Sequence, residues 1–194
     1  QANIVSLRDC NFWYKNGAKR VIMAREMNKE QLKYIMENKP KDLEVEMFGH
    51  GAICFAFSGR CFLSDFLAGR SANLGDCAQS CRWSYKLYAE ERNNPGQYMP
   101  VEESEYGTSI FSSKDLCLIR EIPEIIDMGV DSLKIEGRLK TEYYIATVIN
   151  AYRNAIDDYE KAPQNYNPEK YLNELEKVKT RELTTFYFND RNNK

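Results

Sequence analysis

Four cysteines follow a predicted strand at spacings that suit a metal site. Cys54 and Cys61 are separated by six residues, Cys61 and Cys77 by fifteen, and Cys77 and Cys81 by three. Thiolates gathered by loops bind zinc or an iron-sulfur cluster, because both prefer soft sulfur donors in a tetrahedral arrangement. The alternative is that each thiol is a small buried apolar side chain, an interpretation that fits Cys10 best. The array of four therefore predicts a soft-metal site.

The composition of the chain indicates a globular protein in a reducing compartment. Its 194 residues are 43% hydrophobic and 29% charged, which is enough for a hydrophobic core and most simply for one domain. The formal net charge of -2 excludes a globally basic nucleic-acid binder but leaves a local basic face open. The sequence contains no apolar run of about 18 residues and no charged-then-apolar leader, so we expect a cytoplasmic protein without membrane association. Thiols stay reduced there, which favours metal binding or catalysis over disulfides.

The elements that must position these residues alternate between strand and helix. A closed eight-stranded barrel needs about eight βα units and ~250 residues, whereas about four units are visible here. We therefore predict an α/β fold that is a partial TIM-type (β/α) barrel, with a cysteine-rich insert at 51–113 that contains a β-hairpin at 84–111. The catalytic region spans 1–162, and 163–194 form a C-terminal helix and tail. The predicted strands are 2–6, 20–25, 43–49 and 131–135, and the predicted helices are 28–38, 114–128, 141–159 and 168–181.

Half of a barrel has exposed strand edges, which must be covered by more chain or by another subunit. The chain begins at Gln1 and opens almost directly on a predicted strand. We therefore expect a fragment that lacks the N-terminal half of the barrel, or a homo-oligomer.

The sequence resembles a known family. The matching positions span the end of the predicted third strand and the first two cysteines of the array, and they carry the signature of the collagenase-like peptidase family U32. Longer stretches resemble the subgroup of tRNA hydroxylation proteins, namely GRCFLSDFLAGRSANLGDCAQSCRWSY and RELTTFYF. The signature positions are Glu46, Phe48, Gly51, Ala52, Ile53, Cys54, Gly59, Cys61, Leu63 and Ser64.

The resemblance implies a barrel-type catalytic region and a four-iron four-sulfur cluster. It further implies formation of 5-hydroxyuridine at the wobble position of tRNA, with prephenate as co-substrate and the anticodon loop as partner. Cys117 is the alternative to Cys81 as the fourth ligand, because it follows Cys77 by forty residues, as in some relatives. The cluster ligands that we carry over are Cys54, Cys61, Cys77 and Cys81.

Three residues near predicted strand ends are our catalytic candidates, namely His50, Glu136 and Arg138. Because an unperturbed histidine has a pKa near 6.5, His50 could assist proton transfer, or it could be structural. Arg138 and Lys140 precede a helix and could hold an anion, with Glu136 orienting Arg138, or the group could be a plain capping and salt-bridge cluster.

A collagenase-like peptidase is the alternative function. The chain has neither an HExxH helix nor a GxSxG elbow. A dyad of Cys54 and His50 is the one nucleophilic arrangement that we find. A cluster that uses Cys54 would leave no thiolate for it.

Basic and aromatic residues in the insert could bind RNA, since arginine pairs with phosphates and aromatic rings stack on splayed bases. The alternative is a solvated face with core aromatics. Nearby Glu102, Glu103 and Glu105 would repel RNA. The candidate contacts are Arg60, Arg70, Arg82, Trp83, Tyr85 and Lys86.

Overall fold

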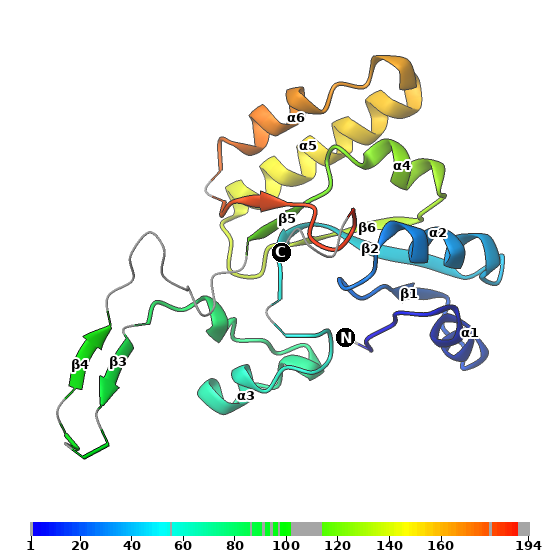
Figure 1. The fold of residues 1–194 in the computed structure, drawn as a ribbon. Helices are drawn as coiled ribbons and strands as arrows, with labels where there is room; N and C mark the ends of the chain where they lie inside the picture. Colours follow the sequence, from blue (N-terminus) through cyan, green and yellow to red (C-terminus); the bar gives the residue numbers. More distant parts are fainter. Residues whose placement is uncertain are drawn as a thin grey trace. The chain divides into compact units, whose positions relative to one another are not determined.

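The computed structural model divides the chain into two compact units (Figure 1). The first comprises residues 1–60 and 113–194, and the second comprises 61–112. The predicted boundary at residue 162 stays a prediction. The structure describes residues 2–54, 56–85, 87–90, 92–93, 95–96, 98–101, 114–178 and 180–189.

The first unit is built on a mostly parallel five-stranded sheet. Its central strand is β2 (Glu44–Ala52), which runs parallel to β1 (Arg20–Ile22) and β6 (Ser132–Glu136). The start of β5 (Asp115–Cys117) pairs antiparallel with the end of β2, and β5 runs parallel to β7 (Leu183–Thr184). The carboxyl ends of β2 and β6 and the amino end of β5 therefore lie at one edge of the sheet.

Three helices of the first unit begin at polar side chains that cap them. Ser6 and Thr141 each accept a backbone N–H of the following turn, and Asn28 forms a capping box with Gln31. None of the described helices combines the length and the apolar character that a bilayer-spanning helix requires. The helices are α1 (Leu7–Lys15), α2 (Lys29–Asn38), α4 (Ile122–Asp127), α5 (Glu142–Lys161), α6 (Pro168–Leu175) and the 3-10 turn η3 (Pro163–Asn165).

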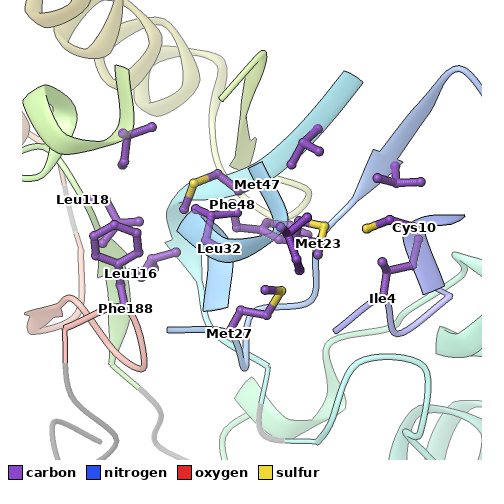
Figure 2. Close-up of a cluster of buried hydrophobic side chains, with 14 of the residues drawn as sticks. Ile4, Cys10, Met23, Met27, Leu32, Met47, Phe48, Leu116, Leu118 and Phe188 are labelled. Atoms are coloured by element: carbon purple, nitrogen blue, oxygen red, sulfur yellow. The ribbon is translucent and has the colours of Figure 1, made fainter. Parts of the chain in front are cut away.

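Two hydrophobic clusters cover the two faces of the sheet, because successive strand residues point to opposite sides. Leu116 and Leu118 join the cluster that includes residues of α1 and α2, and Figure 2 shows them beside Phe188. Cys117 and Ile119 join the other cluster, with residues of α5 and α6. The polypeptide around β5 is thus buried on both faces.

The second unit consists of short elements around the cysteines. The predicted hairpin is confirmed in β3 (Leu87–Glu90) and β4 (Tyr98–Val101), which pair antiparallel. Residues 102–113, with Glu102, Glu103 and Glu105, lie outside the described residues. The helical turns are α3 (Leu63–Ala68), η1 (Ala72–Leu74) and η2 (Ser80–Arg82).

The predicted α/β class is confirmed, with corrections to individual elements. The helix predicted at 114–128 was wrong at its start, because 115–117 form β5 and the helix begins at Ile122, with Pro123 in its first turn. In the predicted strand 2–6, Ile4 forms an isolated bridge with Met23, and α1 was not predicted. The partial barrel stays a prediction. The antiparallel β2–β5 pair departs from the all-parallel order of a TIM barrel.

Candidate functional site

His50 lies in the central strand at the edge where the carboxyl ends meet. It stands opposite Cys117 of β5 and Ile135 of β6, and its side chain is 1% exposed. The next residue, Gly51, has φ +111, and a Cβ at this position would lie 2.3 Å from the carbonyl oxygen of Glu136. Glycine is required here because only glycine allows this backbone conformation and this close strand approach.

The surroundings of His50 keep its imidazole neutral. The pKa of His50 is lowered to about 4, chiefly by burial; the Asp115 carboxylate opposes this shift and the Lys140 ammonium adds to it. The rings of Tyr144 and Tyr152 flank the imidazole at centroid distances of 6.2 and 5.5 Å. The ring therefore carries one proton at neutral pH, which leaves one of its nitrogens as a base.

Asp115 is a fully buried carboxylate at the start of β5. Its Oδ2 lies 3.5 Å from Lys140 Nζ and accepts the backbone N–H of Arg181 at 3.3 Å. Lys140 Nζ also lies 4.6 Å from the centroid of the Tyr144 ring. The ammonium that we predicted as an anion ligand is thus held against a buried carboxylate and an aromatic face.

The other two catalytic candidates stand at the end of β6. Glu136 pairs with Gly51, so it lies beside the strand position that follows His50. Its Oε1 accepts the backbone N–H of Arg138 at 2.9 Å, and Arg138 is exposed in the turn before Thr141, the N-cap of α5. The structure brings His50 and Glu136 to neighbouring positions and leaves Arg138 at the surface.

The four cysteines of the array are divided between the two units. Cys54 follows β2 in the first unit, whereas Cys61, Cys77 and Cys81 belong to the second, and all four are partly exposed. Asn73 clamps the backbone of Cys61: its Oδ1 accepts the Cys61 N–H at 2.9 Å and its Nδ2 donates to the Cys61 carbonyl at 3.0 Å. The segment that carries the Cys61 thiol is thus tied to the turn η1.

A second clamp holds the segment after Cys77. The buried hydroxyl of Ser64 accepts the Ala78 N–H at 2.9 Å and donates to the Arg70 carbonyl at 2.7 Å. Gln79 adopts a left-handed φ of 53 and donates its backbone N–H to Cys77 Sγ at 3.3 Å. Such amide-to-sulfur bonds stabilise thiolates that bind metal.

The array fits a cluster in its donor types but is not gathered into a site. Within the described part of the chain, which includes all six cysteines, no three His, Cys, Asp or Glu side chains form a metal-binding group, and no disulfide is present. The thiols are soft donors on short turns, with an amide directed at one sulfur. Their chemistry suits iron and sulfide, and their convergence stays a prediction.

Cys10 and Cys117 are core thiols. Cys10 is fully buried, and burial raises its pKa to about 11. Cys117 is buried in β5, where burial also raises the pKa of the thiol and Tyr152 Oη lies 3.7 Å from Sγ. Both environments disfavour the thiolate that a metal needs. This favours Cys81 over Cys117 as the fourth ligand, although the choice itself stays a prediction.

The surface of the second unit carries aromatic and basic side chains. Trp83 is 46% exposed, and Tyr85 donates its hydroxyl to the Ser80 carbonyl at 2.6 Å. Arg70 is ion-paired with Asp76 at 2.7 Å, and Lys86 lies outside the described residues. Phe62, the N-cap of α3, and Phe66 within α3 are 82% and 85% exposed, which was not predicted. Their spacing of four residues places both on one helix face.

Sequence reasoning missed Asp115, Tyr144 and Tyr152. Asp115 was assigned to the start of a helix, where an acidic residue is ordinary. Tyr144 and Tyr152 fall within the predicted helix at 141–159, where the sequence does not distinguish them from other apolar residues. A buried tyrosine needs a partner for its hydroxyl, and that need was the available signal.

The polar cluster lies at the carboxyl ends of parallel strands, which is where α/β proteins commonly place their functional sites. The sequence pattern of Peptidase family U32 matches residues 1–194, and the chain belongs to this family. No solved structure matches it.

Several curated relatives cover nearly all of the chain. It is 41% identical to tRNA hydroxylation protein P1 of Bacillus subtilis (strain 168), over 97% of this chain and 44% of the relative. It is 45% identical to an uncharacterized protease of Methanocaldococcus jannaschii, over 99% of this chain and 46% of that protein. A 23S rRNA 5-hydroxycytidine synthase of Escherichia coli (strain K12) is 32% identical, over 98% of this chain and 29% of the relative. The chain thus spans less than half the length of these relatives.

Proposed function

We propose that this chain is part of a cytoplasmic RNA-modifying enzyme that forms 5-hydroxyuridine at the wobble position of tRNA, with prephenate as co-substrate. The observation that carries the proposal is the polar cluster of His50, Asp115 and Lys140 at the strand ends, in a chain whose relatives are named for hydroxylation of tRNA and rRNA. A buried neutral base near an ion pair whose carboxylate is buried and whose ammonium is partly exposed suits proton transfer.

The residues of the two units have different roles in this proposal. In the first unit, His50 accepts or donates a proton at a ring nitrogen, and Asp115 holds the Lys140 ammonium in place. Arg138, in its exposed turn before α5, binds an anionic group such as a carboxylate. In the second unit, Trp83 and the exposed phenylalanines of α3 offer stacking surfaces for unpaired bases.

The cysteine array is our candidate for the cofactor site. We assign Cys54, Cys61, Cys77 and Cys81 as ligands of a four-iron four-sulfur cluster, which supplies one-electron transfer when bound. Asn73 and Ser64 hold the segments that carry two of the ligands.

The test is an anaerobic preparation of the full-length protein, with iron and sulfide assayed beside tRNA hydroxylation followed by nucleoside mass spectrometry. We expect about four irons per chain and formation of 5-hydroxyuridine that requires prephenate. Cys81→Ala should lose both iron and activity. Cys10→Ala is the matched control, since it removes a thiol that lies in the core, and it should keep the iron.

Three results would contradict parts of this proposal. Wild-type protein without iron would remove the cluster. Iron that is retained in Cys81→Ala but lost in Cys117→Ala would mean that Cys117, and not Cys81, is the fourth ligand. A wild-type protein with a full cluster that leaves tRNA unmodified, with and without prephenate, would refute the reaction.

A peptidase is the second candidate, and the name of the archaeal relative favours it. The required dyad is not formed: His50 Nδ1 lies 3.4 Å from Tyr152 Oη, and Nε2 has no hydrogen-bond partner, so neither nitrogen bonds the Cys54 thiol. Collagen or casein cleavage that survives iron chelation and is lost in Cys54→Ala would establish the peptidase.

A further inference from the structure

The hydroxyl of Tyr152 lies within 3.4 Å of His50 Nδ1, and its other contacts determine what it offers to the imidazole. Tyr152 Oη lies 2.8 Å from the Gly49 carbonyl oxygen, 2.9 Å from the Leu118 backbone nitrogen and 3.4 Å from His50 Nδ1. Tyr152 is 3% exposed, so water does not compete for these bonds.

A phenol has one proton to donate. The Gly49 carbonyl can only accept, and its 2.8 Å contact with Oη is attractive only if Oη donates to it. The Leu118 N–H can only donate, so it directs its hydrogen to an Oη lone pair. Tyr152 therefore presents a lone pair to His50. The Nδ1 contact is then attractive only when Nδ1 carries the imidazole proton.

The other ring nitrogen, Nε2, is consequently unprotonated. His50 Nε2 is buried and has no hydrogen-bond partner. The opposite tautomer would bury an unpaired N–H, which is rarer in proteins than an unpaired acceptor, and would set two lone pairs against each other at Nδ1. Charged and titratable groups face the ring from several elements. They are Asp115 and Cys117 of β5, Glu136 at the end of β6, Lys140 in the following turn, and Tyr144 and Tyr152 of α5.

We propose that Tyr152 is a positioning residue that holds His50 as the Nδ1–H tautomer, so that Nε2 is a buried acceptor for an N–H or O–H group of the substrate. The identity of that substrate rests on the proposed function, whereas the tautomer does not. A buried acceptor without a hydrogen-bond partner is the feature that a donor group would complete.

The first test observes the ring itself. In the full-length protein labelled with 15N-histidine, long-range 1H–15N spectra distinguish the two tautomers and the charged ring, and the His50 signal is identified by its loss in His50→Gln. We expect a protonated Nδ1 and a bare Nε2 at pH 7. A protonated Nε2, alone or with Nδ1, would overturn the proposal. This result is independent of hydroxylation, so it separates the proposal from failure of the proposed function.

The second test removes the hydroxyl and keeps the ring. In Tyr152→Phe we expect the tautomer ratio to move toward Nε2–H, and kcat for tRNA hydroxylation to fall about 10- to 100-fold with KM nearly unchanged. Tyr159→Phe is the matched control, because it removes a hydroxyl of the same helix that bonds Asp127. An unchanged tautomer in Tyr152→Phe would contradict the role of Tyr152. If that variant does not fold, the wild-type spectrum still decides.

Discussion

His50 and Cys77 are both capable of chemistry, and the chain holds them in opposite ways. His50 is fixed by a central strand that pairs with β5 on one side and β6 on the other, and it is almost fully buried. Cys77 is partly exposed on a turn that a few hydrogen bonds define, in a unit of short helical turns and a hairpin. The geometry around His50 is thus set by the fold, whereas we expect the geometry around Cys77 to be set by the metal that it binds.

This difference has an energetic basis. Strand pairing and two hydrophobic clusters support the surroundings of His50, so its geometry is determined before any ligand arrives. Small units with little core commonly depend on metal for their stability, because binding free energy becomes folding free energy. The comparison therefore predicts that substitutions near His50 act on the free energy of unfolding, and that substitutions near Cys77 act mainly on metal retention.

The largest effect is expected from Gly51→Ala. The added Cβ would lie 2.3 Å from the Glu136 carbonyl oxygen, at a backbone φ of +111. Overpacking and left-handed strain together should cost about 4 kcal/mol in the free energy of unfolding, measured by urea denaturation. Gly49→Ala is the control, because its Cβ would make ordinary contacts at 3.5 Å with Leu133. Equal stability of the two variants would show that the β2–β6 approach is looser than the structure has it.

Acidification gives the second effect. The pKa of His50 is lowered to about 4 in the folded chain, from about 6.5 in the unfolded chain. The unfolded state therefore binds the proton first, and stability is lost as the pH falls from about 6.5 to 4. The loss should reach about 3 kcal/mol relative to His50→Gln, which cannot titrate there. If the stability of wild type and of His50→Gln has the same pH dependence, folding does not lower the pKa of His50.

The sequence revealed more of the second site than of the first. The spacing of the cysteines is a local signal, and it could be read without knowledge of the fold. The cluster around His50 combines Asp115, Lys140 and Tyr152 from elements that are far apart in the chain, so only strand register brings them together. Register could not be predicted, because 114–128 had the apolar content of a helix and β5 occupies only three of its residues.

The helices were more predictable than the strands. Asn28 and Thr141 mark the starts of α2 and α5 as expected, since a capping side chain and a helical apolar period are both local properties. The exposed phenylalanines of α3 could not be predicted, because an apolar residue in a short segment looks the same whether it is buried or exposed.

The third effect belongs to the second unit. Asn73→Ala removes both hydrogen bonds that clamp the Cys61 backbone, at 2.9 and 3.0 Å. These bonds are partly exposed, so the loss in the free energy of unfolding should be about 1 kcal/mol. If the clamp positions a ligand, the variant should lose most of its iron on dialysis even though its stability changes little. Asn154→Ala is the control, since its amide bonds only Asn150 on an exposed face of α5. Full iron retention in Asn73→Ala would separate the clamp from the metal.

The smallest effect is expected at Phe66, whose ring is 85% exposed on α3. Phe66→Ala should change the free energy of unfolding by less than about 0.5 kcal/mol, because the ring loses little packing when it is removed. Phe188→Ala should cost about 3 to 5 kcal/mol, since that ring is buried beside Leu116 and Leu118. If Phe66 stacks on RNA, tRNA affinity should fall by about 1 to 3 kcal/mol with stability unchanged, which a filter-binding titration measures. A marked loss of stability in Phe66→Ala would instead mean that this ring is packed against protein. The second unit would then be stabilised by its own packing, as the first unit is, and the contrast between His50 and Cys77 would be smaller.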